Sequence, residues 1–319
     1  MIRIYVNEEK KRKIENIFWQ DAQKAKTGII NVLKDKAVIR IIKSNHSKIY
    51  NRLYDPKTKE PDENEVKKLL FADRAELKQY IDEFGSYEGK MVLSEELVNQ
   101  VFRYKNFSER QSAVKILREL DIYTCPYCNR QYIFTLKNGR VRPQFDHYYP
   151  KSLYPYLALS LNNLIPSCSI CNQAKSLLDT VTTPILYPYE EEFGYDVKFN
   201  VEINKRENYA RIMQGISDDF EIKVCAEGLD AVKNQMEKLH LNELYNEHKG
   251  YVQDILKSYY INPPERIQEL YDKFGGLFSS KEEIRGLLYM TALDKASWGS
   301  RPLSKLTYDI DKQLEKKEI

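Results

Sequence analysis

The hydrophobic positions predict a helical first part, a short mixed segment and a largely helical remainder. Over residues 8–120, apolar side chains recur at the three- and four-residue spacing that is typical of amphipathic helices. A polar loop interrupts this pattern at 54–65, where two prolines and several acidic residues oppose a packed element. We therefore expect residues 1–120 to form a helical N-terminal region.

The pattern changes near residue 121. Residues 132–145, YIFTLKNGRVRPQF, form two β-rich runs around Asn138-Gly139, which is a strong hairpin signal because both turn residues tolerate positive φ. Further on, polar and apolar residues alternate at 196–203 and at 220–225, which predicts a small β element. Helical patterns then continue to the end.

These patterns predict an α+β fold in which helix predominates. We expect three regions: a helical region at 1–120, a small module at 121–185, and a β element followed by helices at 186–319. No run of about 18 apolar residues occurs, so no transmembrane helix is expected. The N-terminal residues lack the apolar core of a signal peptide, so we expect a cytoplasmic protein.

Charge is distributed unevenly along the chain. The formal net charge is only +3, which by itself says nothing about partners. Between residues 122 and 178, however, there are six basic residues and a single acid, Asp146, whereas 47 acids in 319 residues would place about eight in a segment of 57. Such local basic clustering is the electrostatic footprint of a phosphate-binding surface, so it favours a nucleic-acid partner over a chance fluctuation.

Four of the five cysteines form two C-x-x-C pairs, Cys125/Cys128 and Cys168/Cys171. Each pair matches the geometry with which a tight turn binds a tetrahedral zinc ion. Four thiolates close the coordination sphere, so we expect this zinc to be structural. A thioredoxin-like redox role is less favoured because it needs only one pair, and unliganded core cysteines would not require the double spacing.

The cysteine pairs are separated by 39 residues, about twice the usual gap in a simple zinc ribbon. Within this interval lie Asp146 and His147, while Asn172 directly follows the last cysteine. A zinc ion would bring a carboxylate, an imidazole and a carboxamide towards one point on a basic surface. Phosphodiester hydrolysis needs these parts: a base for water, a divalent cation and cationic positioning of the backbone.

Residues 123–178 resemble the HNH endonuclease family, which has a ββα-metal fold with flanking zinc knuckles. The family pattern is C-x-x-C, an Asp-His pair followed by a proline, an asparagine before an apolar strand, and C-x-x-C-(His or Asn) with a lysine three residues later. This chain matches it with Asp146-His147, Pro150 and Asn163 between its two cysteine pairs, and with Asn172 and Lys175 after the second pair.

The resemblance implies that His147 is the general base and that Asp146 and Asn172 hold the catalytic metal. It also implies that Asn163 orients the imidazole through a loop hydrogen bond, with Asn162 as an adjacent alternative. Oxygen ligands alone favour Mg²⁺ or Mn²⁺ over softer ions. The expected nucleic-acid contacts are Lys175, Lys151, Arg142 and Arg140.

The wider chain is also similar to HNH subunits of bacterial anti-phage systems that act beside an ATPase, such as Septu. This implies a defence effector with an ATPase partner, acting on DNA in preference to RNA. An effector that is inert without its partner is compatible with this reading. The alternative hypothesis is that the protein is not an enzyme but a zinc-knuckle nucleic-acid-binding protein, which would need no Asp-His pair.

Overall fold

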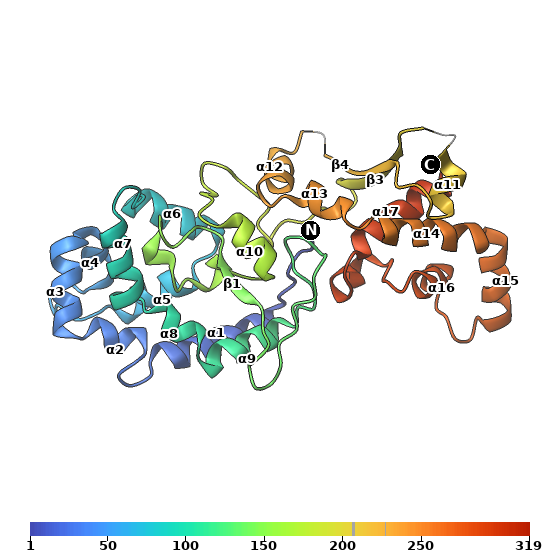
Figure 1. The fold of residues 1–319 in the computed structure, drawn as a ribbon. Coiled ribbons are helices and arrows are strands. Elements are labelled where there is room, and N and C mark those ends of the chain that lie inside the picture. Colours follow the sequence, from blue (N-terminus) through green and yellow to red (C-terminus); the bar gives the residue numbers. More distant parts are fainter. Residues whose placement is uncertain (206–207, 227) are drawn as a thin grey trace. The chain divides into compact units, whose positions relative to one another are not determined.

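The computed structural model of the chain describes residues 1–205, 208–226 and 228–319. Helix makes up 53% of it, and two small antiparallel sheets are present (Figure 1). The predicted α+β class with predominant helix is therefore confirmed. The chain divides into two compact units. The N-terminal unit comprises residues 4–121 and 134–183, and the C-terminal unit comprises residues 1–3, 122–133 and 184–319.

The N-terminal unit begins with a series of short helices around an apolar core. Leu33, Ile42, Leu77 and Ile116 are fully buried in this core. The helices before the strands are α1 (Glu8–Ala22), α2 (Ile29–Leu33), α3 (Lys36–Asn45), α4 (Ser47–Leu53), α5 (Glu63–Phe71), α6 (Arg74–Phe84), α7 (Met91–Glu96), the π-helix η1 (Leu97–Val101), α8 (Tyr104–Ser108) and α9 (Gln111–Leu120).

Two short strands and a helix complete this unit. β1 (Gln144–His147) pairs antiparallel with β2 (Leu164–Ser167), and α10 (Ser169–Lys175) follows β2 directly. The 3₁₀ turns η2 (Pro155–Leu157) and η3 (Leu161–Asn163) lie in the connection between the strands. The order strand, strand, helix is the ββα order that the resemblance predicts.

The hairpin predicted around Asn138-Gly139 is only partly confirmed. A tight turn does form there, since Gly139 has φ of 71° and the Leu136 amide donates to the Val141 carbonyl at 2.9 Å. The run before it is not a strand, and the run after it becomes a strand only at Gln144 and Phe145, the start of β1, which pairs instead with β2. The local turn signal was correct, but the strand pairing is decided by the buried partner strand.

The C-terminal unit contains the second sheet, as the alternating pattern predicts. β3 (Lys198–Ile203) pairs antiparallel with β4 (Phe220–Cys225). Phe199, Phe220 and Ile310 are fully buried in its core. Its helices are α11 (Tyr209–Met213), α12 (Asp230–Lys238), α13 (Leu241–Asn246), α14 (Lys249–Ile261), α15 (Pro264–Phe274), α16 (Lys281–Leu288), the 3₁₀ helix η5 (Lys295–Ser300) and α17 (Ser304–Glu315).

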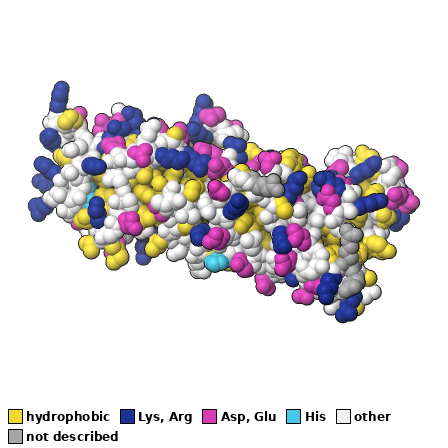
Figure 2. All heavy atoms as spheres, turned by 90° about the horizontal axis from the view of Figure 1, so that it is seen from above, with side chains coloured by type: hydrophobic (Ala, Val, Ile, Leu, Met, Phe, Trp, Pro, Cys, Tyr) yellow, Lys and Arg dark blue, Asp and Glu magenta, His cyan; other side chains and the backbone are white. Residues whose placement is uncertain are grey.

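Charged side chains of both signs are interspersed over the face drawn in Figure 2, with hydrophobic side chains exposed between them. This mixed face agrees with the small net charge of +3. Among the described residues, no helix is long and apolar enough to cross a membrane.

Candidate active site

His147 is the last residue of β1 and is almost completely buried. Its Nε2 lies 3.0 Å from the carbonyl oxygen of Ala158. A carbonyl can only accept a hydrogen bond, so Nε2 carries the proton and Nδ1 of the neutral ring is the basic nitrogen. Burial, and then the positive charge of Lys151, hold the pKa of His147 well below its usual value of 6.5. The ring is therefore neutral at pH 7, which is the form in which Nδ1 can take a proton.

Asn163 is fully buried and holds the loop that follows His147. Its Nδ2 donates to the carbonyl oxygens of Tyr149, at 3.0 Å, and Leu157, at 3.2 Å, while its Oδ1 accepts from the Tyr149 amide at 2.7 Å. These bonds close the loop that ends at Ala158, whose carbonyl binds the imidazole. Asn162 instead donates to backbone carbonyls of Phe71 and Ala72.

Asp146 forms a buried ion pair with Lys175. The Lys175 ammonium lies 3.2 and 3.3 Å from the two carboxylate oxygens of Asp146 and donates to the His147 carbonyl at 2.6 Å. Lys175 is only 2% exposed, with its ammonium turned to Asp146 and His147, and its contact with nucleic acid stays a prediction. Lys175 is the last residue of α10, and its side chain reaches Asp146 on β1. Its charge offsets the cost of burying the Asp146 carboxylate.

Asp146 and Asn172 are the side chains that suit a divalent cation. Both line one cleft together with His147. A carboxylate offers about four lone-pair positions, so in general it can pair with a lysine and bind a metal at the same time. Asn172 donates through Nδ2 to Oε1 of Gln144 at 2.7 Å, so its Oδ1 is the atom that could bind a metal. This oxygen-only donor set fits a hard cation such as Mg²⁺ or Mn²⁺.

The other expected nucleic-acid contacts lie in different places. Lys151 lines the cleft and is partly exposed. Arg140 is exposed beside the turn at Asn138-Gly139, and Arg142 is partly exposed just before β1. The structure thus places Lys151 in the cleft with Asp146 and His147, while the two arginines are outside its lining.

Tyr104 is a site residue that the sequence did not reveal. Its ring packs edge-on against the His147 imidazole, with ring centroids 4.4 Å apart, and its hydroxyl donates to the Phe145 carbonyl at 3.2 Å. The ammonium of Lys151 lies 5.5 Å from the centre of the same ring. Tyr104 comes from α8, about 40 residues before His147, so no local spacing could have indicated the contact.

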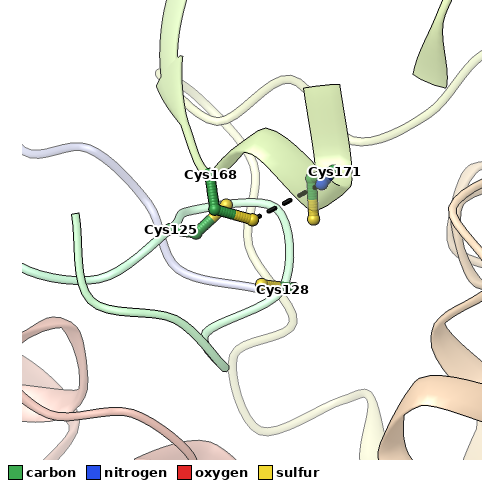
Figure 3. Close-up of side chains that lie close together, drawn as sticks. All are labelled: Cys125, Cys128, Cys168 and Cys171. Atoms are coloured by element: carbon green, nitrogen blue, oxygen red, sulfur yellow. Dashed lines mark hydrogen bonds between the residues drawn. The ribbon is translucent and has the colours of Figure 1, made fainter. Parts of the chain in front are cut away.

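The four cysteines of the two C-x-x-C pairs form one cluster (Figure 3). Their sulfur atoms all lie within 4.8 Å of one another, and all four residues are buried. A tetrahedral zinc with Zn–S bonds of about 2.3 Å would place its sulfurs about 3.8 Å apart, so the cluster is close to the required geometry. Backbone amides support two of the sulfurs, from Arg130 to Cys128 and from Cys171 to Cys168, both at 3.4 Å. The four thiolates could hold one zinc ion.

Comparisons with known proteins agree with this geometry. The family model for HNH endonuclease matches residues 125–177. The chain is also 26% identical over 159 residues to the Septu protein PtuB of Bacillus thuringiensis, a match that covers 50% of this chain and 51% of that protein. The chain thus aligns with about half the length of the curated relative, and no solved structure matches it. Residues 125–177, with their ββα order and cysteine cluster, are an HNH endonuclease domain.

Proposed function

We propose that this protein is a metal-dependent endonuclease that hydrolyses phosphodiester bonds, with DNA favoured over RNA. The observation that supports this most strongly is the neutral His147, whose Nε2 is bound by Ala158 and whose Nδ1 is basic, in one cleft with Asp146 and Asn172. Neither a zinc-knuckle binding protein nor a structural module requires this combination.

In the proposed reaction, Nδ1 of His147 takes a proton from the attacking water as the water oxygen bonds to phosphorus. The P–O bond to the leaving sugar oxygen breaks, and that oxygen takes up a proton from solvent. The Ala158 carbonyl keeps the ring in the required tautomer and stabilises the imidazolium that forms. Asp146 and Asn172 would hold the divalent cation, which neutralises charge on the phosphate when bound. Lys151 adds a positive charge in the same cleft and helps to position the phosphate.

The four cysteines would hold a structural zinc ion. All four are buried, and four thiolates leave no open position for a water or a substrate. We further propose that residues 121–185 act as the nuclease module between the regions 1–120 and 186–319. Reduced cysteines of this kind suit the cytoplasm.

The similarity to a Septu protein leads us to propose a role in bacterial anti-phage defence. In this role the protein would be an effector working with a partner protein, for which an ATPase is our candidate. The test is plasmid cleavage with and without the product of the neighbouring gene.

Metal dependence tests the function itself. Asp146→Ala removes the one carboxylate of the proposed cation site, so its cleavage rate should fall, and raised Mg²⁺ or Mn²⁺ should restore part of it. Asn172→Ala should behave in the same way. Gln173→Ala, on the exposed side of α10 and outside the cleft lining, is the matched control and should cut at the wild-type rate. Cleavage that persists with all divalent cations removed would refute the proposal.

A further inference from the structure

The cleft beside His147 has a lining of two chemical kinds. It measures about 700 Å³, and the side chains already described make up part of its polar lining. Another part is apolar and comes from Met91 on α7, Val98 on η1 and Leu177 just after α10. Met91 is 71% exposed and Leu177 is 67% exposed. Large apolar side chains exposed beside a reactive centre mark a surface that a ligand covers.

The charge of the lining argues against a double helix as the occupant of this cleft. Among the described residues that line it, Lys151 carries the single positive charge, because His147 is neutral, while Glu95 and Asp146 are acidic. Duplex DNA presents phosphates on two strands and is recognised by many lysines and arginines. Arg140 and Arg142 are absent from the lining. The lining thus carries one positive and two negative charges, so Lys151 and the proposed divalent cation together could receive one backbone but not two. The surface next to them is uncharged.

An unpaired base complements that uncharged surface. Every base has an apolar face, which neighbouring bases cover in a duplex and which becomes available in a single strand. Proteins that bind single strands combine a cation for the backbone with apolar or aromatic side chains for the bases, and Tyr87 adds an aromatic side chain to this lining. A volume of 700 Å³ falls in the range of about 300–1,000 Å³ that is usual for sites of small organic groups.

We propose that Met91, Val98 and Leu177 hold an unpaired base next to the scissile phosphate, so that the preferred substrate is single-stranded or locally unpaired nucleic acid. This inference rests on the proposed nuclease function, because it places the base beside the phosphate that His147 and the cation would attack. The N-terminal helices then contribute directly to substrate choice, through α7 and η1.

Binding measurements on the His147→Ala protein test this without cleavage. The probes are a fluorescein-labelled 20-mer, the same strand in a perfect duplex, and a duplex with one bulged nucleotide. We expect the single strand and the bulged duplex to bind more tightly than the perfect duplex. Adding Met91→Ala and Leu177→Ala together should weaken single-strand binding about 5-fold or more, since contact with one base typically contributes this much.

Val92→Ala with Ile170→Ala is the matched control. Both residues are exposed and apolar, they lie on α7 and α10, and neither lines the cleft. This control should bind every probe like the parent protein. Equal affinity for the single strand and the perfect duplex, or equal losses in the two double variants, would overturn the inference.

Cleavage by the protein with His147 intact separates the two proposals. If it cuts perfect duplex as fast as single strand in a His147-dependent way, the substrate inference fails while the nuclease proposal stands. If no probe is cut even with the partner protein present, but single-strand binding depends on Met91 and Leu177, the base-binding cleft stands and the nuclease proposal fails.

Discussion

Removing the buried Lys175 ammonium should destabilise the protein strongly. In Lys175→Met, the apolar stem is kept and the charge is lost, which leaves the Asp146 carboxylate buried at 3% exposure without its cation. At 3.2 Å and an effective dielectric constant near 20, the direct attraction between the two charges is about 5 kcal/mol. Desolvation offsets much of this in the intact pair, but deleting one partner typically costs about 3–5 kcal/mol.

The assay is thermal or urea unfolding of four proteins: the wild type, Lys175→Met, Asp146→Asn and the double variant. For a unit of this size, 3–5 kcal/mol corresponds to a fall in Tm on the order of 10 °C. The double variant should lose less stability than the sum of the single variants, because no uncompensated charge remains buried. Gln173→Met, exposed on the same helix, is the control.

A different result would show that Lys175 acts on the surface. If Lys175→Met unfolds like Gln173→Met, and instead loses oligonucleotide affinity that depends on salt, then this lysine contacts a phosphate and the ion pair with Asp146 is not formed in solution.

Three further predictions concern the His147 site and the cysteine cluster. Tyr104→Ala should slow cleavage about 10-fold, because the His147 ring loses the ring that packs against it. Tyr104→Phe keeps this packing and should keep most of the rate. Equal cleavage rates for the two variants would exclude a positioning role for Tyr104. The pKa of His147 is lowered, and its neutral form is the proposed base. The cleavage rate should therefore stay level as pH falls to 6.5 and drop only below that pH. A cleavage rate that already falls between pH 8 and 7 would contradict this. Cys125→Ser with Cys168→Ser should lose zinc and unfold at lower temperature, as metal analysis and calorimetry would show; stoichiometric zinc in a folded variant would disprove the assignment.

The parts of the site that could be predicted from the sequence are those encoded by short-range spacing. The spacing of the two C-x-x-C pairs predicted the cysteine cluster. The alternation of polar and apolar residues predicted β3 and β4. The adjacency of Asp146 and His147 indicated the site before its geometry was known. These features depend on bonds and periodicities within a few residues, which a sequence displays directly.

Other features depend on contacts between distant segments and could not be predicted. The turn at Asn138-Gly139 formed, but the buried β2 determined which strand pairs with β1. Lys175 looks like a surface cation in sequence, and only the packing of α10 against β1 shows that it is buried with Asp146. Tyr104 reaches the His147 ring from another helix. Tertiary packing decides such contacts, and local propensity carries no signal for them.

The most direct test of the account is cleavage by His147→Ala across a titration of Mg²⁺ and Mn²⁺, on plasmid and single-stranded substrates, with any required partner protein present. Loss of a general base typically costs about 10²–10⁴-fold in rate, whereas binding depends on other side chains. We predict a rate lower by this factor that no cation concentration restores, with zinc content and oligonucleotide affinity unchanged. Cleavage by His147→Ala at the wild-type rate would contradict the account, because His147 would then serve only the fold.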